Sequence, residues 1–136
     1  MMVASDAVLS ELVKRLIEHL GQWCIEKVIL SKQPDFIEKN QIILDADKVG
    51  NIVLRYWKAG DRFSPRGING SKKLARVMRD LHISAGERRI WPLVADENHI
   101  YWIAFLRGSN YGLPDKNTKK YLLITLKKEN REDEES

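Results

Sequence analysis

The sequence predicts an α+β domain in which a mixed or antiparallel sheet of about five strands is covered by two helices. Short runs rich in β-branched and aromatic residues alternate with turn residues along most of the chain, which is typical of strands and hairpins. One segment at the N-terminus and one near the middle instead repeat apolar residues at helical spacing. The 136 residues suffice for one domain with a core, and no apolar run has the roughly twenty residues that a membrane helix needs.

The first predicted helix lies near the N-terminus, where Ser5 or Asp6 can cap its start. Its apolar positions at helical spacing are Leu9, Leu12, Val13, Leu16, Ile17, Leu20, Trp23 and Cys24. Residues 26–40 follow as a connector with room for one short strand, because a turn at Pro34 comes after three apolar residues. Residues 1–40 are therefore expected to form an N-terminal helix and a connector.

Two hairpins are predicted in the folded domain, which we place at residues 41–128. Between residues 41–46 and 52–57 lies the segment Lys48-Val49-Gly50-Asn51, which favours a turn. Residues 91–95 and 99–106 flank a turn-rich tripeptide, and Ser84 is placed to cap a short helical turn before them.

A last strand is predicted at residues 120–128, where Leu122, Ile124 and Leu126 share one face. Residues 129–136 contain no apolar side chain and are expected to form a solvated, charged tail.

Between the hairpins lies a loop rich in glycine and basic residues that leads into the second predicted helix, at residues 72–81. Ser71 is the expected N-cap of this helix. Its apolar face comprises Leu74, Val77, Met78 and Leu81, and its basic face comprises Lys72, Arg76 and Arg79. A glycine-rich turn before a basic helix start suits an anion, and the obvious anion is a nucleic-acid phosphate.

The positive charge of the chain is concentrated around this loop. Residues 55–91 contain ten basic and three acidic residues, whereas the rest of the chain contains thirteen basic and sixteen acidic residues. Concentrated positive charge is typical of proteins that bind a polyanion, although a solvated lysine and arginine face gives the same count.

The sequence predicts neither a catalytic nor a metal site. His19, His82 and His99 are scattered, and Cys24 is the sole cysteine, so no nucleophile motif or metal-ligand spacing is present. A lone cysteine and an N-terminus unlike a signal peptide favour a cytoplasmic protein. Asp61 is expected to order the basic loop by accepting backbone N–H groups or pairing with an arginine.

Several motifs in fixed order resemble a known family. They are Leu54-Arg55, Gly60-Asp61-Arg62-Phe63, Pro65-x-Gly67 and Gly70-Ser71-Lys72-Lys73-Leu74. Across roughly residues 42–126 the chain resembles the C-terminal domain of tRNA(Ile)-lysidine synthetases. These enzymes use ATP to attach lysine to the wobble cytidine of an isoleucine tRNA with a CAU anticodon.

The resemblance implies that this chain recognises tRNA and is inactive alone. The activity of the family belongs to an N-terminal ATP-pyrophosphatase domain with a Ser-Gly-Gly-x-Asp-Ser loop, and this sequence has no such loop. The implied partners are the isoleucine tRNA and that catalytic domain. ATP and magnesium are implied for the parent enzyme, and no cofactor is implied for this chain.

Candidate tRNA contacts follow from the motifs and from helical geometry. The resemblance implies backbone contacts by Arg55, Arg62, Lys72 and Lys73. The helical geometry adds Arg76 and Arg79, and further candidates are Arg88, Arg89 and Arg107. The residues expected to shape the loop are Gly60, Asp61, Phe63, Pro65, Gly67 and Gly70. After Leu106 the sequence departs from the arginine-and-acid spacing of the family.

Two other functions remain open at this point. The chain can be a protein-interaction domain whose predicted helix, at residues 9–23, docks on a partner while the basic face keeps it soluble. It can also be an independent module that binds another structured RNA, because the loop chemistry alone does not select tRNA.

Overall fold

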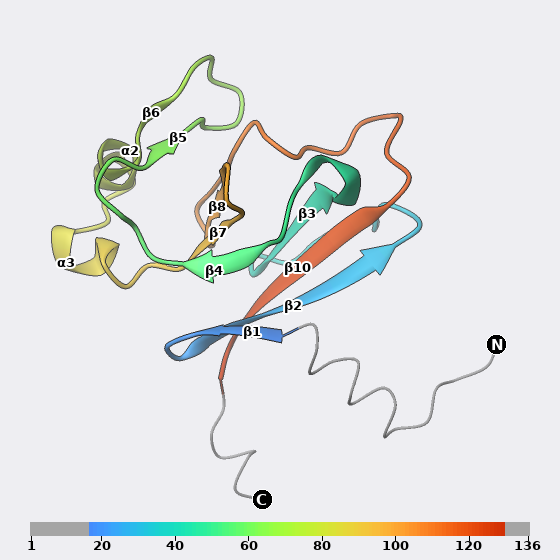
Figure 1. The fold of residues 1–136 in the computed structure, drawn as a ribbon, viewed down its shortest axis with the longest axis horizontal. Helices are drawn as coiled ribbons and strands as arrows, with labels where there is room; N and C mark the ends of the chain where they lie inside the picture. Colours follow the sequence, from blue (N-terminus) through green and yellow to red (C-terminus); the bar gives the residue numbers. More distant parts are fainter. Residues whose placement is uncertain (1–16, 130–136) are drawn as a thin grey trace, which may run out of the picture.

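The structure is a computed structural model that describes residues 17–129 of the chain. The described part contains ten strands, two short α-helices and one 3-10 turn, arranged as three antiparallel sheets (Figure 1). The elements are β1 (Ile17–Leu20), β2 (Trp23–Leu30), β3 (Gln41–Asp45), η1 (Ala46–Lys48), β4 (Val53–Arg55), β5 (Arg62–Phe63), β6 (Lys72–Lys73), α2 (Leu74–Asp80), α3 (Ala85–Arg88), β7 (Leu93–Ala95), β8 (Ile100–Ile103), β9 (Arg107–Gly108) and β10 (Tyr121–Lys128).

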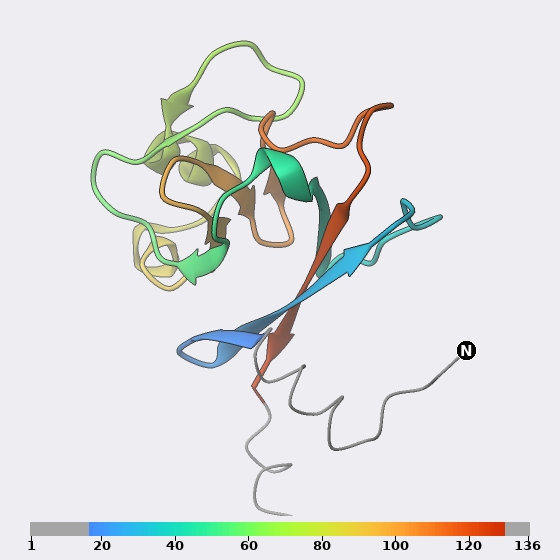
Figure 2. The same cartoon turned by 45° about the vertical axis from the view of Figure 1, so that its right-hand side comes forward.

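The first sheet has the strand order β1-β2-β10-β3, so the last strand of the chain lies between two early ones. β10 pairs along its whole length with β2 and along five residues with β3. Leu122, Ile124 and Leu126 are buried and alternate with partly exposed residues, which confirms the predicted strand and its inward face. Figures 1 and 2 show that this sheet forms one side of the molecule.

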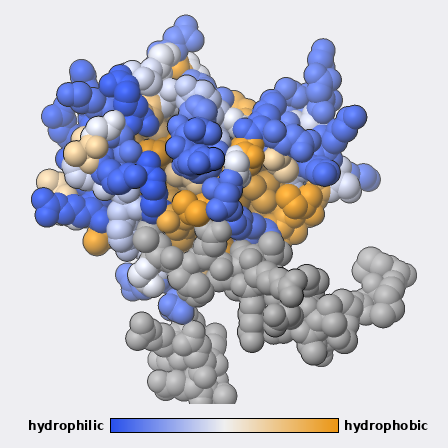
Figure 3. Space-filling view, viewed as in Figure 1, coloured by the Kyte–Doolittle hydropathy of each residue, from blue (hydrophilic) through white to orange (hydrophobic). Residues whose placement is uncertain are grey.

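The second sheet has the order β4-β7-β8-β9, and the third is the two-stranded β5–β6 ribbon next to α2. The predicted hairpin at 91–95 and 99–106 is confirmed by the β7–β8 pair. The predicted turn after Ser84 is also confirmed, because the Ser84 side chain and Glu87 form a capping box at the start of α3. The surface over β5, β6 and α2 is mostly hydrophilic (Figure 3).

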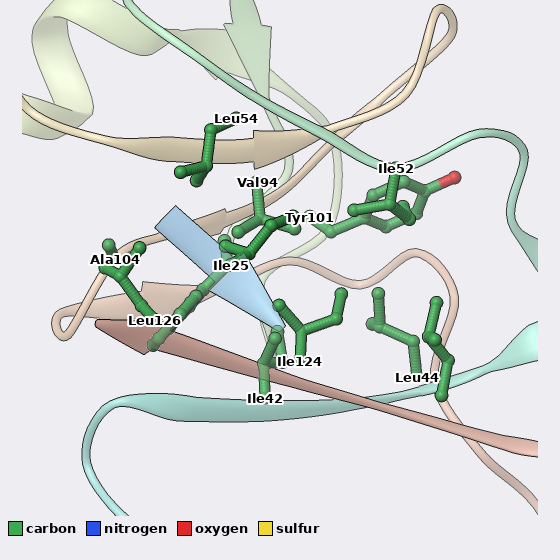
Figure 4. Packing of buried hydrophobic residues seen from close by; sticks show 12 residues of the cluster. Ile25, Ile42, Leu44, Ile52, Leu54, Val94, Tyr101, Ala104, Ile124 and Leu126 are labelled. Atoms are coloured by element: carbon green, nitrogen blue, oxygen red, sulfur yellow. The ribbon is translucent and has the colours of Figure 1, made fainter. Parts of the chain in front are cut away.

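The β7–β8 hairpin is buried on both faces and separates two hydrophobic clusters. On one face Val94, Tyr101 and Trp102 pack against the first sheet. Side chains from the two sheets point toward one another there (Figure 4). On the other face Leu93 and Ile103 pack with Phe63 and α2. A register shift between Val94 and Ala95 lets Tyr101 and Trp102 both enter the first cluster.

Two predictions, the N-terminal helix and the first hairpin, need correction. The predicted N-terminal helix is wrong for residues 17–24, which lie in β1 and β2, and its earlier part falls outside the described residues. Gly21 has φ of 59° and turns the chain between two strands, and pairing of β2 with β10 outweighs the local helical spacing. Residues 41–46 and 52–57 do not form a hairpin, because β3 pairs with β10 and β4 with β7.

The central helix is also shorter than predicted. It begins at Leu74 and not at Lys72, and Ser71 is not its N-cap, because Lys72 and Lys73 belong to β6 and pair with β5. Leu74, Val77 and Met78 are buried as predicted. Within residues 17–129 no helix has the length and apolarity required to cross a membrane.

Asp96 closes the β7–β8 hairpin. Its carboxylate accepts hydrogen bonds from the backbone N–H groups of Gly50, Asn98 and His99 and from the Tyr101 hydroxyl. Burial alone would raise the pKa of Asp96, but these four bonds outweigh it and lower the pKa to about 2. Burial and the hydrogen bond to Asp96 raise the pKa of the Tyr101 hydroxyl. Asp96 thereby ties the hairpin to the segment between the two sheets.

This geometry predicts an acid-dependent loss of stability that Asp96→Asn removes. The folded pKa of about 2 lies below the ordinary value of 3.8, so the stabilisation is present above the ordinary value and disappears as the pH falls through the folded pKa. The stability advantage of the wild-type chain over Asp96→Asn should shrink by about 2 kcal/mol between about pH 5 and about pH 2. Urea unfolding at several pH values measures this difference, and titration of the other acids cancels between the two proteins. An advantage that does not change with pH would contradict the prediction.

Candidate nucleic-acid interface

The β5–β6 ribbon carries basic side chains outward from an apolar base. Phe63 in β5 is 1% exposed and Leu74 at the start of α2 is fully buried, which anchors both ends of the ribbon in the second cluster. Arg62 lies opposite Lys73 across the ribbon. Arg62, Lys72 and Lys73 are all exposed, whereas Phe63 and Leu74 take the inward positions.

Asp61 orders the turn before the ribbon, as predicted. It forms a two-pronged ion pair with Arg55 at 2.9 and 3.0 Å and accepts the backbone N–H of Lys58 at 2.8 Å. Burial would raise the pKa of Asp61, but these contacts hold it below its usual value. Arg55 also donates to the Tyr56 carbonyl, so this arginine supports the loop from within. Its predicted contact with tRNA stays a prediction.

Residues 64–71, between the two ribbon strands, are held by a residue that the sequence analysis did not single out. Asn110 donates from its side-chain amide to the carbonyls of Pro65 and Ile68, and it accepts the backbone N–H of Gly67. Gly67 has φ of 83°, which only glycine adopts without strain. The loop is therefore ordered by a long-range clamp that local sequence patterns do not reveal.

Arg66 is a second missed residue. Its guanidinium lies against Gly108, where an added Cβ would come within 2.7 Å of the terminal nitrogen. Arg107 in turn donates to the Arg66 carbonyl at 3.1 Å. The family spacing breaks down after Leu106, yet Gly108 there leaves the space that Arg66 occupies.

Eight of the predicted cations fall into four pairs. Arg55 and Arg62 line one groove together with Lys58, while Lys72 and Arg107 line a smaller hollow. Arg76 and Arg79 are exposed on α2. Arg88 differs because it is half-buried over the Trp57 ring at 5.2 Å, and Arg89 beside it is exposed. Among the described residues, only Arg55 of this predicted set forms an ion pair with a carboxylate.

The groove beside Arg62 has a volume of about 420 Å³ and runs between the ribbon and the turn of the β7–β8 hairpin. A hollow of about 520 Å³ along residues 67–71 shares Ser64, Ser71 and Tyr111 with it. The ring of Tyr111 stacks on His99 at a centroid distance of 3.9 Å. In the sequence His99 is one of three scattered histidines, and no local pattern brings it next to Tyr111.

An apolar groove of about 590 Å³ lies elsewhere on the molecule. It is lined by Gln22, Trp23, Tyr56, Glu87, Ile90, Trp91, Pro92 and Phe105. Ile90 is 64% exposed, and Phe105 is 37% exposed with φ of 69°. A phenylalanine in the left-handed region is rare, and here it keeps an aromatic ring at the groove edge.

The Arg55–Asp61 pair predicts a stability effect. Both side chains are mostly buried, so Asp61→Ala leaves a poorly solvated guanidinium without its partner and should lower the free energy of unfolding by about 1–3 kcal/mol. Urea unfolding measures the change. Lys127→Ala is the matched control, because it breaks the more exposed pair with Glu26 and should cost less than about 1 kcal/mol. Equal effects of the two substitutions would contradict the structural role of Asp61.

Comparison with known proteins points to one family. The family model for the TilS substrate C-terminal domain matches residues 52–124, more than half of the chain. The tRNA(Ile)-lysidine synthases of Caldanaerobacter subterraneus subsp. tengcongensis and Clostridium acetobutylicum are each 40% identical, over 115 and 92 residues. These alignments cover 83% and 67% of this chain but 25% and 20% of the two enzymes. The chain thus spans about a quarter of the length of the curated relatives that it matches.

Solved structures share the fold. A crystal structure of a TilS C-terminal domain has a TM-score of 0.71 and 24% identity, covering 84% of this chain and 91% of that one. An N-terminal fragment of the phenylalanyl-tRNA synthetase β-subunit from Pyrococcus horikoshii has a TM-score of 0.52 and 15% identity, covering 90% of this chain and 35% of the fragment. The family match and the relatives confirm the resemblance seen in the motifs: the chain belongs to the TilS substrate C-terminal domain family, the C-terminal domain of tRNA(Ile)-lysidine synthases.

Proposed function

We propose that this chain binds tRNA within a cytoplasmic tRNA(Ile)-lysidine synthase and helps to position isoleucine tRNA with a CAU anticodon for the attachment of lysine. The observation that carries the proposal is the exposed basic surface on the ribbon and α2. It comprises Arg62, Lys72, Lys73, Arg76 and Arg79. None of these side chains forms an ion pair with a carboxylate in the described part of the chain.

Such a surface binds a phosphate backbone mainly through release of condensed counterions, so affinity falls steeply with salt. The ordered base of the ribbon limits the entropy lost on binding, because Phe63 and Asp61 already fix the backbone that presents the cations. Shape and contacts to ribose hydroxyls then supply selectivity for a folded RNA.

Catalysis belongs to the remainder of the enzyme in this proposal. Among residues 17–129, no group of three or more histidine, cysteine or acidic side chains is placed to hold a metal ion. The ATP and magnesium of the lysine-transfer reaction are assigned to the catalytic domain, which the chain requires as a partner. This chain alone is expected to form no lysidine.

The apolar groove favours a second role for the same domain, contact with another protein surface. Ile90 and Phe105 at its edges remain exposed in the isolated chain, and the groove has mainly apolar walls. In the proposed enzyme this surface would face the catalytic part while the ribbon faces RNA. Residues 17–20 of the segment expected to dock as a helix form β1 instead, and the part of that segment before Ile17 lies outside the described residues.

Titration with tRNA tests the main proposal. The chain is expected to bind isoleucine CAU tRNA more tightly than elongator methionine tRNA, and both affinities should fall between low and near-physiological salt. Fluorescence anisotropy with labelled tRNAs measures both. Equal affinities would assign the selectivity to the rest of the enzyme. Absence of binding even at low salt would overturn the proposal and leave the protein-interaction role.

A paired substitution tests the lysines of β6. Lys72→Ala with Lys73→Ala should weaken tRNA binding and reduce the slope of log affinity against log salt by about 1.4–1.8, since each phosphate contact contributes about 0.7–0.9. Because both side chains are exposed, the thermal midpoint should stay close to that of the wild type.

The matched control is Lys119→Ala with Lys120→Ala. These lysines are also exposed and adjacent, and they directly precede β10, whose start lies on the opposite side of the molecule from β6 (Figure 1). The two control substitutions remove the same amount of positive charge and leave the ribbon unchanged. An equal change in slope for both pairs would show that net charge alone governs binding, and would contradict the assignment of Lys72 and Lys73 to phosphate contacts.

A further inference from the structure

The polar groove beside the ribbon combines a stacked aromatic pair with a basic wall. Tyr111, 41% exposed, stacks on His99 at 3.9 Å with 26° between the ring planes. Lys58 and Arg62, both exposed, line the same groove. An aromatic surface that shares a groove with cations suits a nucleotide, because the base stacks and the phosphate pairs. We propose that this groove binds one unpaired nucleotide of the RNA held by the ribbon, with its base at Tyr111 and its phosphate at Arg62; the inference rests on the proposed function.

Hydrogen bonds to the backbone fix the segments that carry the two aromatic rings. The buried Ser109 hydroxyl accepts the backbone N–H of Tyr111 at 3.0 Å. The next residue, Gly112, accepts the backbone N–H of Asp45 at 2.8 Å. The backbone N–H of His99 is bound by Asp96 at 2.8 Å. A stacking surface that is ordered before binding loses little conformational entropy when a base arrives.

Arg62 is also held in place for this task. Its guanidinium donates to the hydroxyl and the carbonyl of Ser71, at 2.9 and 3.0 Å, yet the side chain stays exposed and forms no ion pair with a described carboxylate. Of the guanidinium donors, those not used by Ser71 remain for a phosphate. Lys58 adds a second positive charge at the same wall.

The acids in the groove favour a base over a second phosphate. Asp61 is neutralised by Arg55, and Asp96 is enclosed by four hydrogen bonds, so neither is available to a ligand. Glu97, by contrast, is exposed at the hairpin turn. Its carboxylate repels phosphate at that end of the groove, and it can accept a hydrogen bond from the amino group of a base.

The size and lining of the groove fit the same ligand. Its 420 Å³ lies within the range of small-molecule sites, and it continues into the hollow along residues 67–71, which gives the neighbouring backbone a path. The lining is mainly polar, unlike the apolar groove, so an apolar peptide is a poor match. A bare phosphate would leave the aromatic pair unused.

The test compares two RNA hairpins that differ only in a short single-stranded 3′ extension. The extended hairpin should bind the wild-type chain about 5- to 150-fold more tightly, the range expected for one stacked base. Tyr111→Ala should bring this ratio close to one while leaving the affinity for the blunt hairpin nearly unchanged. Tyr111→Phe, which keeps the ring, should keep the ratio.

Controls separate this inference from the proposed function. Phe36→Ala removes an aromatic ring that is 75% exposed outside the groove, and it should leave the ratio unchanged. Salt-sensitive binding of both hairpins with a ratio near one in the wild type, or a ratio that survives Tyr111→Ala, would overturn the nucleotide site but not RNA binding. Binding of neither hairpin would overturn both. Adenosine monophosphate that binds the groove without RNA and depends on Tyr111 would assign the site to a free nucleotide and overturn its RNA role.

Discussion

The burial of the β7–β8 hairpin on both faces is the constraint on which the rest of the structure depends. One face of the hairpin completes the cluster with the first sheet, and the other completes the cluster with Phe63 and α2. Strands buried on two sides need apolar residues at nearly every position, and β8 is buried throughout. Asp96 closes the hairpin with a fully hydrogen-bonded carboxylate, which avoids the cost of an unpaired buried charge. The ribbon and α2 thus pack on this hairpin, and its turn lines the polar groove.

Internal pairing in the basic loop determines which cations are left for a ligand. Arg55 is bound by Asp61, and Arg88 covers Trp57, so these two charges stabilise the fold. Arg62 is positioned by Ser71, whose groups are neutral, and therefore it keeps its full charge toward the solvent. An arginine in this loop thus stabilises the fold when its partner is a carboxylate, and stays available to a ligand when its partner is neutral. A count of lysine and arginine in a sequence cannot separate these roles.

The features that could be predicted correctly from the sequence are those that depend on local pattern. The α+β class, the β7–β8 hairpin, the helical turn capped by Ser84 and the inward face of β10 all follow from alternation, turn residues or capping chemistry within a few positions. The failures share a different cause. The strands β1 and β2 and the split between β3 and β4 arise from pairing with β10 and β7, which lie far along the chain. Likewise Asn110, Arg66 and the His99–Tyr111 pair act across long sequence distances, so no window around them predicts their contacts.

The two grooves of the domain have opposite chemistry, and this difference argues for two separate neighbours. Water competes well for the polar groove, so a ligand there must bring charge and a stacking surface to displace it. The apolar groove holds exposed Ile90 and Phe105, whose burial is favourable by about 25 cal/mol per Å² without any matching charge. RNA offers the first kind of surface and a protein domain the second. Under the proposed function the domain makes both contacts at once: it holds a polyanion while it stays attached to the rest of the enzyme, of whose length it spans about a quarter.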